Sequence, residues 1–308
     1  MLSHLYQKRR ILMKTMKKAL AVLMAVAIVM AFASTAFAAG ESKSIKFLND
    51  FINSKTVGVK LDEITIPEIG LSIKNAEIKA KFEGENKTKA AAKADIGPLS
   101  NVRIFANGND LTGYFAIFKI NVKEFVGDSF DVNAIANEFY PMLEKLNKDT
   151  VDMLALKETK DVNLDGYGAV QAEILTVSPD KIAEKITAEA IKQGKTEAEL
   201  EGKDITALVE LARELNIEEL NYYIALYTVS QSDSGIASFY YKDGNLIGFK
   251  LNVVDEETLE SDSIDTTEAI GFKVKSIVTN LSDSDFNAPA FAIDITGLVK
   301  FFLSFFMG

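Results

Sequence analysis

Residues 236–254 read IASFYYKDGNLIGFKLNVV and carry the clearest hairpin signal in the chain. Two runs rich in aromatic and β-branched residues stand on either side of Asp243 and Gly244. An Asp-Gly pair readily adopts the positive φ angles that a two-residue hairpin turn needs. The stretch therefore predicts two antiparallel strands joined by a tight turn.

The alternation that marks strands also occurs earlier in the chain. Between residues 71 and 82 apolar and charged side chains alternate with a period of two, which is typical of a strand with one buried and one wet face. The apolar side chains of this strand are Ala76, Ile78, Ala80 and Phe82. After a turn at residues 107–110, one continuous strand is expected over residues 111–122, with Tyr114 and Phe118 on the same face. Further strand regions are expected at residues 161–177, 222–229 and 270–281.

Helical signals gather in the middle of the chain. Residues 131–147 have the apolar spacing of a helix, which Pro141 is expected to bend or divide. Ser178 followed by Pro179 predicts the start of a second helix, and Gly194 predicts its end.

Two more helix starts complete a helical insert at about residues 178–216. Thr196 and Glu199 match a capping box, and Asp204 can cap the helix that follows. The chain has no Ser- or Gly-rich linker. We therefore predict a single α+β domain over residues 39–308, in which strands precede and follow a group of three helices.

The first 38 residues have the three parts of a secretory signal peptide. A basic start leads into an apolar stretch that is short and alanine-rich for a membrane span, and small residues end the segment. Cleavage is expected between Ala38 and Ala39. Met16 begins a complete signal unit by itself, so residues 1–15 fit an untranslated upstream extension. No cysteine is present for lipid attachment, and the sequence predicts an exported bacterial protein, periplasmic or extracellular, that is not lipidated.

Removal of the signal peptide changes both the charge and the chemistry of the chain. Six basic and no acidic residues are lost, which takes the formal charge from −10 to −16, and the only histidine leaves with them. So acidic a chain repels nucleic acids. Without imidazole or thiol groups, most nucleophilic catalysis and the usual zinc, haem and copper sites are excluded. No cofactor is expected, and a carboxylate-based hydrolase is the one enzyme class that remains.

Several acidic motifs have the composition of cation or catalytic sites. The opening of a calcium loop is matched by Asp161, Asn163 and Asp165. The twelfth position of that loop is Ala172, so a hairpin turn at Asp165-Gly166 is the favoured interpretation. The acidic run over residues 255–268 is interpreted as a solvated loop, and Asp283 with Asp285 is interpreted in the same way.

The C-terminal segment, residues 294–307, is expected to form a helix that is apolar nearly all round. Such a helix is generally buried in protein or in lipid, and this one is short for spanning a bilayer. A helix that docks on the protein and closes its core is favoured over a peripheral membrane contact. The membrane contact would be made by Leu298, Phe301, Phe302, Phe305 and Phe306.

Three segments carry a resemblance to a known superfamily: ETKDVNLDGY at 158–167, YYKDGNLI at 240–247 and DFNAP at 285–289. They resemble the turn and closing strands of LolA-like lipoprotein carriers and of the related mycobacterial lipid-carrying envelope lipoproteins. The resemblance implies an open, strongly curved antiparallel half-barrel with helices on its concave face and an apolar cavity that shelters acyl chains. The lipidation cysteine of many relatives is absent here, and the helical insert and the phenylalanine-rich tail are longer than the pattern requires.

The function expected from these observations is binding or carrying of a lipid or another hydrophobic ligand in the cell envelope. The candidate lining residues are Tyr114, Phe115, Ile117, Phe118, Phe139, Leu208 and Leu211. The alternative is a non-catalytic structural or interaction protein of the envelope, with a filled core and another envelope protein as its partner.

Overall fold

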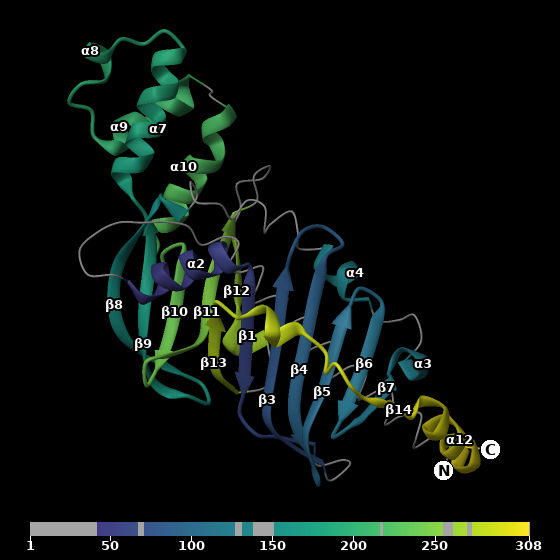
Figure 1. The fold of residues 1–308 in the computed structure, drawn as a ribbon. Coiled ribbons are helices and arrows are strands. Elements are labelled where there is room, and N and C mark those ends of the chain that lie inside the picture. The colour runs from purple at the N-terminus through teal and green to yellow at the C-terminus, as the bar shows by residue number, and fades with distance from the viewer. Residues whose placement is uncertain are drawn as a thin grey trace.

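The computed structural model describes residues 42–66, 71–126, 131–137, 151–215, 218–254, 261–269 and 273–307. The predicted signal peptide, its cleavage site and Phe139 lie outside these residues. Two sheets lie side by side and together form a curved, open surface with helices against it (Figure 1). The predicted α+β fold built on a curved antiparallel sheet is confirmed.

The first sheet contains most of the N-terminal strands. Its strands run in the order β13-β1-β3-β4-β5-β6-β7-β14, and β2 pairs with β3. Their bounds are β1 (Thr56–Leu61), β2 (Ile64–Ile66), β3 (Leu71–Phe82), β4 (Thr88–Ile96), β5 (Leu99–Asn107), β6 (Asp110–Phe115), β7 (Phe118–Asn121), β13 (Val274–Thr279) and β14 (Ile293–Asp294). All the strand pairs are antiparallel except β7 with β14, which is parallel.

The second sheet has the order β12-β11-β10-β9-β8 and is antiparallel throughout. Its strands are β8 (Leu154–Leu164), β9 (Gly168–Val177), β10 (Ala237–Lys242), β11 (Asn245–Val254) and β12 (Ser261–Asp265). The predicted turns at Asp165-Gly166 and Asp243-Gly244 join β8 to β9 and β10 to β11, and both glycines have positive φ angles. The two sheets meet where β11 lies beside β13 (Figure 1).

Helix α2 (Lys43–Ser54) covers the junction of the two sheets. Its Phe47 ring lies 6.5 Å from that of Phe239 on β10, and its Phe51 ring lies 6.4 Å from that of Phe82 on β3. We call the face of the first sheet that carries Val57 and Phe82 the inner face, and the opposite face the outer face. One continuous cluster of buried apolar side chains runs from the inner face through α2 to the helices of the insert.

The remaining helices are short, belong to the helical insert or directly follow it, except the one at the C-terminal end. They are α3 (Lys123–Val126), α4 (Val132–Asn137), α7 (Pro179–Lys192), α8 (Glu197–Leu200), α9 (Ile205–Glu214), α10 (Glu218–Ser230), α11 (Thr266–Ala269), the 3-10 helix η3 (Asp283–Phe286) and α12 (Thr296–Met307). Helices α7, α9 and α10 pack on one another beyond the ends of β8 to β11 (Figure 1). Ser178, Thr196 and Asp204 precede α7, α8 and α9 as predicted. The capping box of Thr196 with Glu199 forms, and the Asp204 carboxylate accepts a 2.8 Å hydrogen bond from the Ala207 N–H, whereas the Ser178 side chain makes no capping hydrogen bond.

Two elements differ from the sequence prediction. Residues 222–229 were predicted to be a strand but belong to α10, which packs against α7, α9, β9 and β11. The strand expected over residues 111–122 is broken by a turn at Ala116-Ile117, with Ala116 at a φ of 52°. Neither residue is a usual turn former, so the sequence held no signal for this break.

The acidic stretch near residue 260 also differs from its prediction where it is described. Residues 261–265 form β12, which pairs with β11, and α11 follows directly. Residues 255–260 lie outside the described part of the chain.

Candidate functional site

The residues expected to line one cavity lie in separate places. Tyr114 is buried on the outer face of β6, where its ring meets that of Phe105 edge-on at 5.5 Å. Phe115 and Phe118 face each other across the β6–β7 turn on the opposite face, and Ile117 lies in that turn. Leu208 and Leu211 belong to α9, which Figure 1 shows at the far end of the molecule. The described members of the set therefore do not form one pocket.

Large apolar side chains are instead exposed together at the free end of the first sheet. The set, which we call the apolar edge, consists of Phe115, Ile117, Phe291, Ile293, Leu298, Phe301 and Phe302. Their exposed fractions run from 36% to 75%. They come from three segments: the β6–β7 turn, the residues around β14, and α12.

Backbone hydrogen bonds bring these three segments together. The Ile293 N–H donates to the Ile117 carbonyl at 2.8 Å, and the Ile295 N–H donates to the Lys119 carbonyl at 3.0 Å. The Asn121 N–H then donates to the Thr296 hydroxyl at 2.9 Å. The chain is thereby held along β7 up to the first residue of α12, which places that helix at the corner of the molecule (Figure 1).

The position of α12 corrects one expectation. A helix that closes the core would bury its apolar side chains, but Leu298, Phe301 and Phe302 are each more than half exposed. For Phe305 and Phe306 the structure describes the backbone only. The described apolar side chains of α12 therefore lie outside the core, contrary to the expectation of a docked helix.

Charged groups beside the apolar edge are paired with one another. Lys300 on α12 forms an ion pair with Glu124 of α3, and the Lys119 ammonium lies 3.7 Å from the Asp294 carboxylate. Hydrogen bonds from Thr296 hold the pKa of Asp294 below its ordinary value. Because each cation has a carboxylate partner, the edge presents little net charge.

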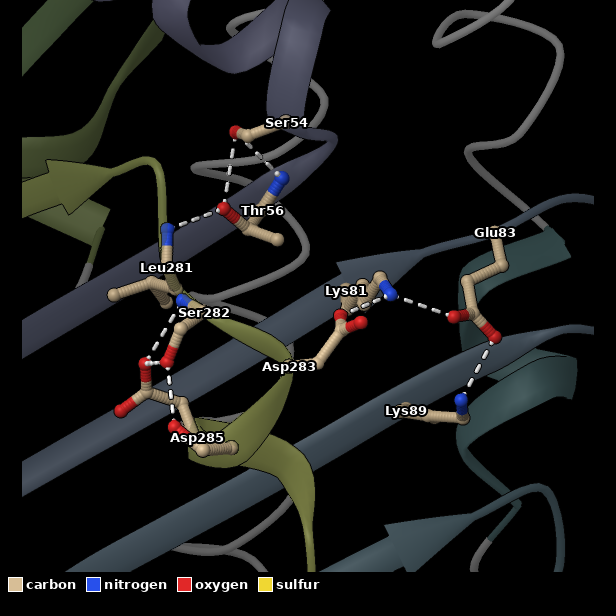
Figure 2. Close-up of polar contacts among 10 residues, drawn as sticks. Ser54, Thr56, Lys81, Glu83, Lys89, Leu281, Ser282, Asp283 and Asp285 are labelled. Carbon is tan, nitrogen blue, oxygen red and sulfur yellow. Dashed lines mark hydrogen bonds and ion pairs between the residues drawn. The ribbon is translucent and has the colours of Figure 1, made fainter.

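On the outer face a second cluster fixes η3 to the sheet. The Lys79 ammonium lies 2.7 Å from the Asp285 carboxylate. The Lys81 ammonium lies 2.6 Å from Asp283 and 2.7 Å from Glu83 (Figure 2). Hydrogen bonds to Asp283 and Glu83 raise the pKa of Lys81. Asp283 and Asp285, interpreted from the sequence as part of a solvated loop, are therefore anchors of the C-terminal segment.

The residues predicted as a possible calcium site belong to the β8–β9 hairpin of the second sheet. Asp161 and Asn163 lie along β8, and Asp165 begins the turn to β9. Within the described ranges, no three His, Cys, Asp or Glu side chains come close enough to hold a metal ion.

The sequence did not single out Glu173, the one charged residue that is buried among those described. Its carboxylate accepts hydrogen bonds from the Ser42 hydroxyl at 2.7 Å and from the Ser44 N–H and hydroxyl at 2.9 and 2.7 Å. The carboxylate thus satisfies donors at the N-terminus of α2 and has a structural task.

Comparison of this chain with protein-family models, with curated proteins and with solved structures found no significant match. In the described segments, no helix is both long and apolar enough to cross a membrane.

Proposed function

We propose that this protein is a non-catalytic protein of the cell envelope that binds the surface of a lipid bilayer through the apolar edge. The observation that supports the proposal most directly is the gathering of seven exposed, large apolar side chains at one corner of the molecule. Exposed apolar residues that are scattered singly need no explanation, whereas a contiguous group indicates a contact with a membrane or a partner.

The length and composition of α12 favour a lipid surface. Its 12 residues extend about 18 Å, which is well short of the roughly 30 Å hydrocarbon core of a bilayer. A short helix with several phenylalanines suits the boundary between headgroups and acyl chains. The β6–β7 turn beside it supplies Phe115 and Ile117 as further points of insertion.

The energy available for binding is modest but sufficient for reversible attachment. Full burial of a Leu, Ile or Phe side chain contributes roughly 1.5–3 kcal/mol, and these side chains are already partly covered. We therefore expect about 1 kcal/mol from each of the seven side chains before the cost of ordering is subtracted. The paired charges of Lys300 and Lys119 predict little dependence on anionic lipid.

The proposal keeps the ligand class that the sequence suggested and moves its place from an interior cavity to the surface. One continuous core runs through the inner face, α2 and the insert, which suits a filled interior. The predicted mature chain has no histidine or cysteine, and this composition suits a protein that binds without catalysing a reaction.

Flotation of vesicles tests the proposal. We expect the exported, processed protein to float with phosphatidylcholine vesicles, and the F301S/F302S variant to lose most of this binding. Both side chains are more than half exposed, so the substitutions should leave the fold intact. Ile191→Ser is the matched control, because Ile191 is an exposed apolar residue on α7, remote from the edge. Equal flotation of the three proteins, or a stable dimer that buries the edge and does not bind vesicles, would contradict the proposal.

A further inference from the structure

A row of charged residues crosses the outer face of the first sheet. Lys60 on β1 pairs in register with Glu77 on β3, Glu77 pairs with Lys93 on β4, and Lys93 pairs with Arg103 on β5. Directly paired residues share a face and lie on strands about 4.8 Å apart. The four side chains therefore form a continuous line across four strands.

Two hollows lie along this row. The larger has a volume of about 640 Å³ and includes Lys60, Lys275 and the amides of Asn75, Asn101 and Asn245 in its walls. The smaller, of about 220 Å³, includes Arg103, Phe105 and Asp285. Both hollows share Glu77, Lys93 and Asn101, so they are two parts of one polar groove.

Two adjacent cations, Lys93 and Arg103, lie at the centre of the groove, and Asp95 is near enough to Lys93 to interact with it electrostatically. Lys93 and Arg103 oppose each other directly, and like charges in such a cross-strand pair repel. Neither forms an ion pair among the described residues, and the buried Arg103 Nε has no hydrogen-bond partner there. A buried donor without a partner costs stability, so this arrangement favours an acceptor from outside the chain.

The nearby carboxylates are committed to other groups. Glu77 lies 3.3 Å from the Lys79 ammonium and 3.9 Å from that of Lys60. Asp95 accepts hydrogen bonds of 2.6 Å from both the Asn101 N–H and the Asn75 amide, and these bonds hold its pKa below the ordinary value. These carboxylates form part of the polar wall of the groove, and among the described residues neither makes an ion pair with Arg103.

We propose that this groove binds an acidic saccharide. A carboxylate or phosphate group of the ligand accepts from the Arg103 guanidinium and the Lys93 ammonium, a pairing that such planar or tetrahedral anions make well. The three asparagine amides supply donors and acceptors for sugar hydroxyls, and the Phe105 ring supplies an apolar surface beside them. A groove of this volume fits a ligand of two or three sugar units.

The site is separate from the apolar edge and does not depend on it. The cations are notable because the chain as a whole is strongly acidic. General attraction of anions to the protein surface therefore cannot account for binding at the groove, and local geometry has to supply it.

Titration calorimetry with defined probes tests the assignment. Trigalacturonate presents carboxylates, glucose 6-phosphate presents a phosphate, and maltotriose is the neutral control. We expect saturable binding of at least one acidic probe, weakened by added salt, with maltotriose bound at least about tenfold more weakly. The acidic probe that binds identifies whether the anion is a carboxylate or a phosphate.

Variants locate the binding. Arg103→Gln should weaken binding of the acidic probe by about tenfold or more, and Lys93→Gln by about threefold or more. Lys203→Gln, an exposed lysine between α8 and α9, is the matched control and should bind like the unaltered protein. Lys93 is exposed, so its variant keeps the test valid if the Arg103 variant does not fold. Absence of binding by both acidic probes at millimolar concentration, equal binding of maltotriose, or unchanged binding by the Lys93→Gln protein would overturn the assignment.

Discussion

Glu173 shows how a single residue holds the start of the folded chain. Its carboxylate lies on β9 and accepts hydrogen bonds from both serines at the first turn of α2, and Ser44 is also within 2.9 Å of the Tyr241 hydroxyl. Burial raises the pKa of Tyr241, so this phenol stays neutral beside the carboxylate. A sequence with many acidic residues gives no sign that this one is buried, because the partners are about 130 residues away.

Glu173→Ala should lower the free energy of unfolding by about 3 kcal/mol, because it leaves buried hydroxyl and N–H donors without their charged acceptor. Glu173→Gln should cost less, since the amide oxygen keeps part of the network. Glu158→Ala, an exposed site on the neighbouring β8, should cost less than about 0.5 kcal/mol. Urea unfolding measures all three. Equal costs for the two alanine variants would show that Glu173 has no structural role.

Two helices or strands differ from the sequence prediction: residues 222–229 form a helix, and the strand expected over residues 111–122 is broken by a turn. Residues 222–229 are rich in Tyr, Ile, Val and Thr, which favour strands, and the sequence therefore predicts a strand there. In the structure this segment is enclosed by α7, α9, β9 and β11, and burial on several sides lets a helix form despite its propensity. Helix starts with polar caps, such as that of α9 at Asp204, could be predicted because cap and helix are neighbours in sequence.

The attachment of η3 to the sheet predicts a dependence of stability on pH. The hydrogen bond from Lys79 holds the pKa of Asp285 below its ordinary value. A carboxylate with a depressed pKa in the folded state stabilises above its unfolded pKa, near 3.9, and this contribution is lost as the pH falls through the folded pKa. Asp285→Asn should therefore cost about 1 kcal/mol at pH 7 and progressively less between about pH 4 and pH 2.

Urea unfolding over this pH range measures the difference between the two proteins. Asp233→Asn is the control, because Asp233 is exposed in a turn and should show no such convergence. If the cost of Asp285→Asn is the same at pH 2 and pH 7, the ion pair with Lys79 does not stabilise the fold.

At the scale of the whole molecule, α2 joins the two sheets while α12 stands at their edge. Phe47 and Phe51 of α2 contact rings from different sheets, so this helix unites the core. The described side chains of α12 contribute little to that core. The helix is attached mainly through β14 and through the ion pair of Lys300 with Glu124. Loss of α12 should therefore affect binding more than folding.

Truncation of the chain after residue 296 tests this division. The shortened protein keeps β14 and the Thr296 hydroxyl that holds Asn121. We expect it to be soluble, with a thermal midpoint within a few degrees of that of the intact protein, and to lose most of its flotation with vesicles. An unfolded or aggregated product would show that α12 completes the core.

Local features of this protein could be predicted from the amino-acid sequence: the hairpin turns at Asp165-Gly166 and Asp243-Gly244, the starts of the insert helices, and the alternation along β3. These depend on residues within a few positions of one another, where φ preferences and side-chain capping act directly. Contacts between distant segments make α10 a helix, bury Glu173 and leave the described side chains of α12 exposed. They also bring Lys93 and Arg103 face to face, because strand register and helix docking are set by contacts between distant parts of the chain.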